Sequence, residues 1–217
     1  KAIDNAPGHL ENYNGDNSRI NIRNSASEKG LSSYDQPFNN TTSILYDLPF
    51  GHGRHFSIDN KIVDFLAGGW GTNLTNTLTS GLPVNITYSA SQQYQVSPLV
   101  TARPNVIGDP ITPEGQRTIK NYLNAASFTL PSYTQPFGNA GRNIARSYPL
   151  YNLDLGLHKN FYLGAETRYV QFRAEAFNLF NQTNFQPPNS TFGNTAFGSI
   201  SSTFPARQIQ FALKLYF

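Results

Sequence analysis

The last ten residues of the chain, Gln208-Ile209-Gln210-Phe211-Ala212-Leu213-Lys214-Leu215-Tyr216-Phe217, place a large apolar side chain at every second position. Because successive side chains of a β-strand point to opposite faces, this pattern predicts a strand with one wholly apolar face. That face carries Ile209, Phe211, Leu213, Leu215 and Phe217. The opposite face carries Gln208, Gln210, Ala212, Lys214 and Tyr216. Such a strand separates an apolar environment from a wet one.

The length of this strand fits one crossing of a membrane. A strand tilted by about 45° rises roughly 2.3 Å per residue along the membrane normal, so about ten or eleven residues cover the ~25 Å apolar band of a transmembrane barrel. We therefore interpret residues 207–217 as a strand with one wall facing lipid and one facing water. An amphipathic strand of a soluble sandwich has the same pattern, so the rest of the sequence must decide.

The composition of the chain favours the membrane interpretation. Charged residues make up 13% of the 217 residues, about half of their usual share of ~25%. Asn, Ser, Thr, Gly and aromatic residues are abundant, as expected where uncharged polar side chains face a lumen and apolar ones face lipid. The mean hydropathy is −0.42, and no apolar stretch approaches the ~18 residues of a membrane-spanning helix. Any membrane element should therefore consist of strands.

Charge and cysteine content exclude several kinds of function. The net charge of +3 arises from 16 Lys and Arg against 13 Asp and Glu, scattered without a basic run, so no nucleic acid is expected as a partner. The chain has no cysteine, which excludes disulfides, thiolate metal sites and a cysteine nucleophile. It starts at Lys1, has no Met and shows no signal peptide. We therefore expect a fragment of a longer exported protein that holds the native C-terminus.

Two strands are predicted in the first half of the chain. From about residue 40 to 48, three apolar side chains fall on one face, and these are Ile44, Tyr46 and Leu48. Thr-rich alternating sequence from about 66 to 88 predicts one long second strand, which Gly81-Leu82-Pro83 should bend or place at an edge. The connection between the two strands, about 50–67, reads as a turn region.

Two more strands in the second half form a predicted hairpin over residues 150–161 and 166–178. Their apolar positions are Tyr151, Leu153, Leu155 and Leu157 in the first strand and Val170, Phe172, Ala174 and Ala176 in the second. The alternating residues are polar or charged, so the hairpin has one face of each kind. We expect the last strand, 207–217, to lie beside 166–178.

The connections between these strands alternate in length. Segments 1–39, 89–147 and 179–206 are long, whereas the connection near residue 164 is short. Outer-membrane barrels have long loops outside and short periplasmic turns. Five crossings that begin outside end inside, which puts Phe217 on the periplasmic side. The predicted fold is thus all-β, an antiparallel transmembrane β-barrel fragment of about five long strands in an open sheet, with long extracellular loops.

Aromatic residues gather at the inferred strand ends. They are Phe50, Trp70, Tyr88, Tyr148, Phe161, Tyr162, Phe177, Phe180, Tyr216 and Phe217. This distribution is typical of the aromatic girdles at the two interfaces of a membrane barrel. A general preference of aromatic residues for strands would produce a similar list.

Five passages carry a more specific signal, namely Glu28–Asp35, Tyr46–Gly51, Phe137–Asn143, Phe172–Asn181 and Arg207–Lys214. In this order, over nearly the whole chain, they resemble the C-terminal β-barrel region of TonB-dependent, Oar-like outer-membrane receptors and transporters. The resemblance implies a barrel of about twenty-two strands filled by an N-terminal plug. The plug, of which nothing is present here, carries the motif contacted by the inner-membrane energy-transducing complex.

The end of the chain also resembles the C-terminal signal by which bacterial outer-membrane barrels are recognised for assembly. The residues that would form this outer-membrane assembly signal are Phe211, Leu213, Leu215 and Phe217. The resemblance thus implies four partners: outer-membrane lipid, the barrel assembly machinery, the remaining strands of the parent chain and, through the missing plug, the energy-transducing complex. The implied location is the bacterial cell outer membrane.

Under this resemblance the whole chain, 1–217, is the C-terminal part of a receptor barrel. Residues 1–39 would be an extracellular loop, 40–88 strands, 89–147 a long extracellular loop, and 148–217 the last three strands with loop 179–206. The implied function is to form part of the wall and extracellular loops for uptake of a bulky nutrient such as a siderophore or an oligosaccharide. A soluble β-rich glycan-binding module and an outer-membrane adhesin or hydrolase barrel stay open as alternatives.

The sequence offers few candidate sites. It has no Gly-x-Ser-x-Gly and no recognisable catalytic constellation around its histidines, so we expect no catalytic residues, no enzyme activity and no cofactor. His52 and His55 lack a third ligand at a suitable spacing, so no metal site is expected. Four side chains should project to the polar faces of neighbouring strands as lumen-facing candidates, namely Asp154, His158, Arg173 and Glu175. They would contact cargo or plug, or form a cross-strand charge ladder.

Overall fold

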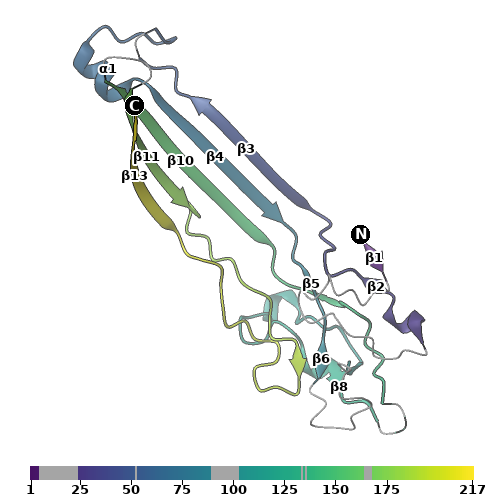
Figure 1. The fold of residues 1–217 in the computed structure, drawn as a ribbon. Coiled ribbons are helices and arrows are strands. Elements are labelled where there is room, and N and C mark those ends of the chain that lie inside the picture. Colours follow the sequence, from purple (N-terminus) through teal and green to yellow (C-terminus); the bar gives the residue numbers. More distant parts are fainter. Residues whose placement is uncertain (5–23, 52, 89–102, 133, 135, 164–167) are drawn as a thin grey trace. The chain divides into compact units, whose positions relative to one another are not determined.

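The computed structural model describes residues 1–4, 24–51, 53–88, 103–132, 134, 136–163 and 168–217. The chain divides into two compact units, each made of three segments. The sheet unit consists of Asn39–Leu78, Tyr151–Thr183 and Pro205–Phe217. The loop unit consists of Lys1–Phe38, Thr79–Leu150 and Asn184–Phe204. Elements of both units are labelled in Figure 1.

One five-stranded sheet dominates the sheet unit, in the order β13-β11-β10-β4-β3. Its strands are β3 (Asn39–Asp47), β4 (Trp70–Thr79), β10 (Leu150–Tyr162), β11 (Tyr169–Phe177) and β13 (Gln208–Tyr216). β11 pairs antiparallel with β10 on one side and with β13 on the other. Figure 1 shows these strands as long ribbons that lie side by side and alternate in direction. The predicted five strands, the hairpin and the position of the last strand are confirmed.

The register of the sheet separates its side chains into two faces. Leu157 lies opposite Ala174, which lies opposite Phe211, and this row belongs to the apolar face. One residue further along, His158 lies opposite Arg173 on the polar face. Because side chains alternate along every strand, each row of partners stays on its own face across the sheet. The apolar face of β13 is solvent-accessible in the described chain, with Phe211 71% and Leu213 72% exposed.

A short helix, α1 (Lys61–Ala67), interrupts the connection between β3 and β4. The prediction of a turn region at 50–67 missed it. Asn60 caps the helix, since its side-chain oxygen accepts hydrogen bonds from the backbone N–H groups of Ile62 and Val63 at 3.0 and 3.2 Å,. Gly69, with φ at 70°, turns the chain from the helix into β4,. No helix among the described residues is long and apolar enough to cross a membrane.

The second predicted strand is correct only up to Thr79, where β4 ends. Beyond the bend at Gly81-Leu82, two short strands β5 (Pro83–Val84) and β6 (Thr87–Tyr88) belong to other sheets. β5 pairs with β9 (Ala145–Arg146), and β6 pairs with β12 (Thr191–Phe192). The expectation of one long kinked strand over 66–88 is therefore wrong, because Pro83 has no N–H with which to continue the ladder.

The loop unit has a hydrophobic core of its own. Its buried members are Val84, Ile86, Tyr122, Leu123, Phe128, Ala145 and Ile200. The unit also contains β1 (Ile3–Asp4), β2 (Gly30–Leu31), β7 (Asn105–Val106), β8 (Phe128–Thr129) and the 3-10 helices Ser25–Glu28, Glu114–Gln116 and Ala125–Ser127. The described parts of the predicted long loops are thus packed structure, assembled from segments far apart in the sequence.

Candidate functional site

The polar face of the sheet gathers three of the four lumen-facing candidates. His158 lies directly opposite Arg173 across β10 and β11. The Arg173 guanidinium donates to Oε1 of Glu175 at 2.7 Å, and the other carboxylate oxygen of Glu175 accepts a hydrogen bond from the Gln210 side chain on β13. These side chains therefore share one face over three strands, with an ion pair within β11 and a hydrogen bond from β13, and the cross-strand charge ladder stays a prediction,. Whether this face meets cargo or plug stays a prediction.

Asp154, the fourth candidate, has a different task. Its carboxylate accepts hydrogen bonds from the backbone N–H of Asn178 and from the side chain of Asn152, both at 2.8 Å. Asn178 and Asn181 have φ of 52° and 53°, a conformation that Asn tolerates better than most residues,. The Asn181 side-chain oxygen accepts from the Arg207 N–H at 3.0 Å. Asp154 thus holds the chain reversal after β11.

Two glycines keep the polar face of the sheet flat. A side chain at Gly71 would collide with the imidazole of His158, and one at Gly156 would collide with the amide of Asn73. Since neither glycine has a Cβ, His158 and Asn73 can lie across the neighbouring strand instead of standing away from the sheet. The two glycines therefore allow polar side chains of the neighbouring strands to lie close against the backbone of the sheet.

A hollow of about 940 Å³ lies at the end of the sheet where β10 ends at Tyr162. Its charged lining residues are Asp47, Arg54, Lys61, Asp64 and Lys159, and His158 borders it. Arg54 and Asp47 stand 3.7 Å apart, but both are well exposed, so this pair contributes little. Among the described residues, the hollow is thus lined by both cationic and anionic side chains.

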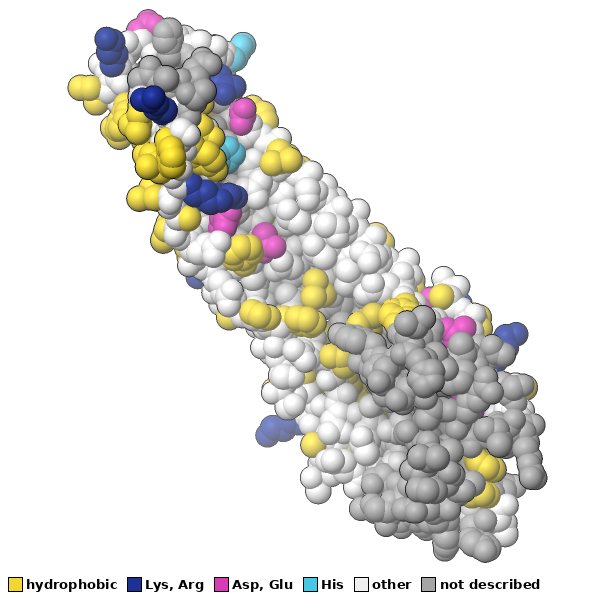
Figure 2. Space-filling model, viewed as in Figure 1, with side chains coloured by type: hydrophobic (Ala, Val, Ile, Leu, Met, Phe, Trp, Pro, Cys, Tyr) yellow, Lys and Arg dark blue, Asp and Glu magenta, His cyan; other side chains and the backbone are white. Residues whose placement is uncertain are grey.

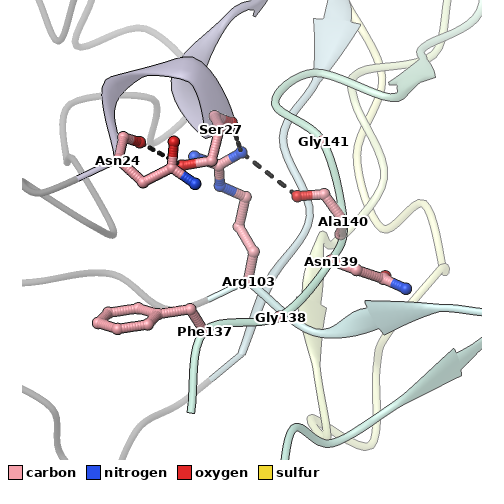
Figure 3. Close-up of a pocket in the computed structure, with 8 residues that line it drawn as sticks. All are labelled: Asn24, Ser27, Arg103, Phe137, Gly138, Asn139, Ala140 and Gly141. Atoms are coloured by element: carbon pink, nitrogen blue, oxygen red, sulfur yellow. Dashed lines mark hydrogen bonds between the residues drawn. The ribbon is translucent and has the colours of Figure 1, made fainter. Parts of the chain in front are cut away.

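The loop unit holds a smaller pocket of about 300 Å³ (Figure 3), lined by Asn24, Ser27, Arg103 and Phe137–Gly141. Arg103 crosses its back wall and donates to the backbone oxygens of Ser27 and Ala140 at 3.4 and 3.3 Å. The Arg103 charge is matched by Glu28, with both side chains at most 4% exposed. The Arg103 guanidinium is therefore already paired within the protein, so the pocket offers no uncompensated positive charge from Arg103 to an anionic ligand.

Two of the passages that carried the family resemblance interlock in this unit. Gly138 lies so close to the backbone of Arg103 and Pro104 that any side chain would collide with it. Asn143 donates from its side chain to the Leu31 oxygen at 2.7 Å, and its φ is 56°. The Phe137–Asn143 and Glu28–Asp35 passages are thus explained by packing within the loop unit.

Asp35 is a second buried and paired carboxylate of the Glu28–Asp35 passage. The backbone N–H of Ala2 and the guanidinium of Arg146 both donate to it. These hydrogen bonds, together with the positive charge of Arg146, hold the pKa of Asp35 below its ordinary value against the opposing effect of burial,. Sequence reasoning missed these buried pairs. The available signal was the presence of single acidic and basic residues in loops that are otherwise poor in charge.

The proposed assembly-signal residues lie on the exposed apolar face. Phe211, Leu213 and Leu215 are 60–72% exposed on β13, and Phe217 is 97% exposed just beyond it. The predicted aromatic girdle needs correction at the end of the sheet where β10 ends, because several tyrosines there do not lie on the apolar face. Tyr162, Tyr169 and Tyr216 form one row whose neighbouring rings lie 5.6 and 4.4 Å apart. By register this row belongs to the polar face, so these tyrosines do not face the same side as Leu213.

Among the described residues no group of three or more His, Cys, Asp or Glu is placed to hold a metal ion. His55 lies in the turn before α1, and His52 is outside the described residues. His55 packs edge-on against the Phe56 ring at 4.8 Å. The structure thus brings together polar side chains on one face of the sheet and a set of buried ion pairs in the loop unit.

Comparison with known protein families agrees with this arrangement. A family model described as an outer membrane beta barrel domain matches residues 1–210, nearly the whole chain. Comparisons with curated proteins and with solved structures gave no match. The two-faced antiparallel sheet is the structure that such a domain requires, since a barrel strand must satisfy its backbone within the sheet and turn apolar side chains to lipid. The chain belongs to the outer membrane beta barrel domain family.

Proposed function

We propose that this chain forms the C-terminal part of the wall and loops of a TonB-dependent receptor in the bacterial outer membrane, which takes up a bulky nutrient such as a siderophore or an oligosaccharide. The observation that carries the proposal is the open two-faced sheet. Within the described chain, β3 and β13 each pair with one neighbouring strand. An exposed strand edge inside a membrane is costly, so further strands of a larger barrel should continue the sheet on both sides.

Two other features support a transport role. The polar face carries hydrogen-bonded side chains on β11 and β13, and Gly71 and Gly156 leave room for polar side chains of the neighbouring strands. Such a face suits a wide lumen wall in contact with water or a plug. The loop unit has its own core and buried ion pairs, so it can hold a defined receptor surface instead of a set of independent loops. The Oar-like resemblance of the five passages then favours a plugged, energised receptor over an open pore.

The alternatives fit the same observations less well. A soluble glycan-binding module would expose the apolar face of β13 to water, and contiguous apolar surface of that kind is rare on soluble monomers. An adhesin or hydrolase of the outer membrane remains compatible with the sheet. It would be favoured if the complete protein closed as a small eight-stranded barrel instead of a large one.

An uptake experiment in the source bacterium tests the proposal. The gene that encodes this chain and the gene for the energy-transducing partner are deleted separately, and uptake of labelled ferric siderophores and oligosaccharides is measured. We expect both deletions to abolish saturable uptake of the same nutrient and the intact gene to restore it in the first strain. Unchanged uptake in the energy-partner deletion would rule out an energised receptor while leaving the membrane barrel intact.

We also propose that the barrel assembly machinery recognises Phe211, Leu213, Leu215 and Phe217. Deletion of Phe217 removes a side chain that is 97% exposed and packs into no described core, so it should lower the amount of barrel inserted into outer membranes without destabilising barrel already inserted. The heat-modifiable folded fraction and its melting in detergent separate these two effects. An equal loss in both measurements would indicate a structural role instead.

A further inference from the structure

The helix α1 is inverted relative to an ordinary amphipathic helix. Its four large apolar side chains are exposed, with Ile62 at 73%, Val63 at 48%, Phe65 at 60% and Leu66 at 64%. Asp64 is the one residue of the seven that is not classed as exposed. A helix at the surface of a water-soluble domain turns its apolar stripe inward and its charges outward. Here the carboxylate faces the protein and the apolar side chains face away from it.

The arrangement follows from the order of residues in the helix. At about 100° per residue, Phe65, Ile62, Leu66, Val63 and Ala67 follow one another around an arc of roughly 200°. Lys61 and Asp64 occupy the remaining arc. The helix therefore has a broad apolar side and a narrow charged side, and only its orientation on the sheet decides which side meets the surroundings.

Several contacts fix that orientation. The Trp70 indole N–H donates to the Leu66 oxygen at 2.9 Å, and the rings of Phe65 and Phe161 lie 5.1 Å apart. The ammonium of Lys159 donates to the oxygen of Gly68, the residue that caps the C-terminus of α1. A positive charge at this end of a helix is favourable. Asp64 supplies a negative charge close to the same ammonium.

Lys159 explains why α1 is attached to the apolar face of the sheet. Its register partner is Phe172, which in turn lies opposite Leu213, so Lys159 breaks the otherwise apolar face. It is only 3% exposed, and its ammonium stands 5.6 Å from the Trp70 ring and 5.2 Å from the Phe161 ring. The Lys159 ammonium therefore contacts the end of α1 and both aromatic rings. These contacts attach the helix to the face of the sheet that meets lipid.

From this geometry we propose that α1 is a membrane-interface anchor, which lies against the phospholipid boundary with Ile62, Val63, Phe65 and Leu66 in the outer part of the acyl chains. The exposed apolar side of α1 continues the apolar face of the sheet at the end where β10 and the chain terminate. Figure 2 shows hydrophobic side chains gathered at this end, next to lysine or arginine side chains. A patch of that composition suits the boundary between headgroups and acyl chains.

The inference rests on the membrane-embedded barrel and is independent of what the barrel transports. It gives the β3–β4 connection a role that a simple periplasmic turn lacks, since α1 would fix the depth of the sheet in the bilayer. The occupant follows from continuity with the lipid-facing wall. A protein partner on the same surface is the competing outcome that the experiment must separate.

Depth-dependent quenching tests the proposal in the full-length protein reconstituted in phospholipid vesicles. This chain contains no cysteine, so after replacement of any cysteine elsewhere in the full-length protein, single cysteines at Ile62 and Leu66 can carry an environment-sensitive fluorophore. Asp59, exposed just before the helix, is the matched control position. We expect phospholipids brominated near the headgroup end of the acyl chain to quench the labels at Ile62 and Leu66 severalfold more than the label at Asp59, and aqueous iodide to show the reverse order.

Two results would overturn the anchor. Labels at Ile62 and Asp59 that are equally open to iodide and unaffected by brominated lipid would place α1 in water. Labels shielded from both quenchers would indicate contact with protein. A heat-modifiable band for each variant establishes that the barrel is folded. As a second test, Leu66→Asp should reduce bromolipid quenching of a label at Ile62, whereas Lys61→Asp on the charged side should leave it unchanged.

Discussion

Arg103 shows how single residues hold the loop unit together. It pairs with Glu28 where both side chains are at most 4% exposed, and it donates to two backbone oxygens from opposite sides of the pocket. Removing one member of such a pair leaves the other charge buried without compensation. We predict that Arg103→Met destabilises the loop unit by about 3–5 kcal/mol, measured as faster proteolysis of the loops and lower resistance to denaturant.

The double variant Arg103→Met/Glu28→Leu serves as the control. It removes both charges, so part of the lost stability should return, although the backbone oxygens of Ser27 and Ala140 still lose their donor,. Equal losses in the single and double variants would show that the backbone contacts, and not the ion pair, carry the effect of Arg103.

Asp35 predicts how the loop unit responds to acid. Its pKa in the folded chain is lowered, first by the hydrogen bond from the Ala2 N–H and then by the Arg146 guanidinium. A lowered carboxyl pKa gives stability that is complete above the unfolded value of about 3.9 and is lost as pH falls through the lower folded value. The hydrogen-exchange protection factors of the loop unit, which are corrected for the slower intrinsic exchange in acid, should therefore fall below about pH 4. Asp35→Asn should exchange faster at neutral pH and show a flatter response to acid.

At the scale of elements, β13 separates two environments. Leu213 lies opposite Phe172 on the apolar face, whereas Gln210 lies opposite Glu175 on the polar face. We predict that Leu213→Arg costs about 2–4 kcal/mol, the penalty for a cation near the middle of the lipid face. Gln210→Arg should be tolerated, because the new guanidinium meets the Glu175 carboxylate and water.

The heat-modifiable folded fraction in outer membranes measures both variants. Equal tolerance of the two arginines would mean that β13 does not separate lipid from water, and the membrane orientation of the sheet would then be wrong. Equal damage by both would point to a packed interior on the polar face instead of a wet lumen.

The sequence predicted the elements that depend on neighbours two residues apart. Alternation identified the strands around Ile44, Leu155, Phe172 and Phe211, whereas their register came from the structure. Helix α1 was missed because it has only 7 residues, about two turns, and directly follows a segment rich in turn residues. Lys159 was the overlooked sign, since a charge among apolar positions of a strand needs a local partner.

The loop unit was beyond such reasoning for a different reason. Its core joins Val84 and Ile86 with Leu123, Phe128 and Ile200, and no window of sequence contains these residues together. The site residues differ in the same way: local alternation predicts some of their positions, whereas others depend on contacts between distant segments. His158, Arg173 and Glu175 were placed on one face by alternation, but the task of Asp154 in the Asn178 reversal depends on a contact between separate elements.

At the scale of the whole molecule, the antiparallel register places Asn39, Leu78, Tyr151 and Phe177 toward one end of the sheet, and Tyr162 and Tyr216 at the other. Along the chain, the crossings between the sheet unit and the loop unit fall at residues 38/39, 78/79, 150/151, 183/184 and 204/205. The short link between β10 and β11 and the helix α1 belong to the second end. In a barrel this asymmetry corresponds to long loops outside and short turns in the periplasm.

Sidedness can be tested by labelling single cysteines on intact cells. Ile107 in the loop unit is 67% exposed, and Leu163, just after β10, is 55% exposed. Gly164 lies outside the described residues, so Leu163 represents the short link. We predict that a membrane-impermeant thiol reagent labels Ile107→Cys on intact cells and labels Leu163→Cys only after the outer membrane is permeabilised. Because both side chains are exposed, burial cannot account for a difference. Labelling of Leu163→Cys together with protection of Ile107→Cys would invert the topology and place Phe217 and α1 at the outer leaflet.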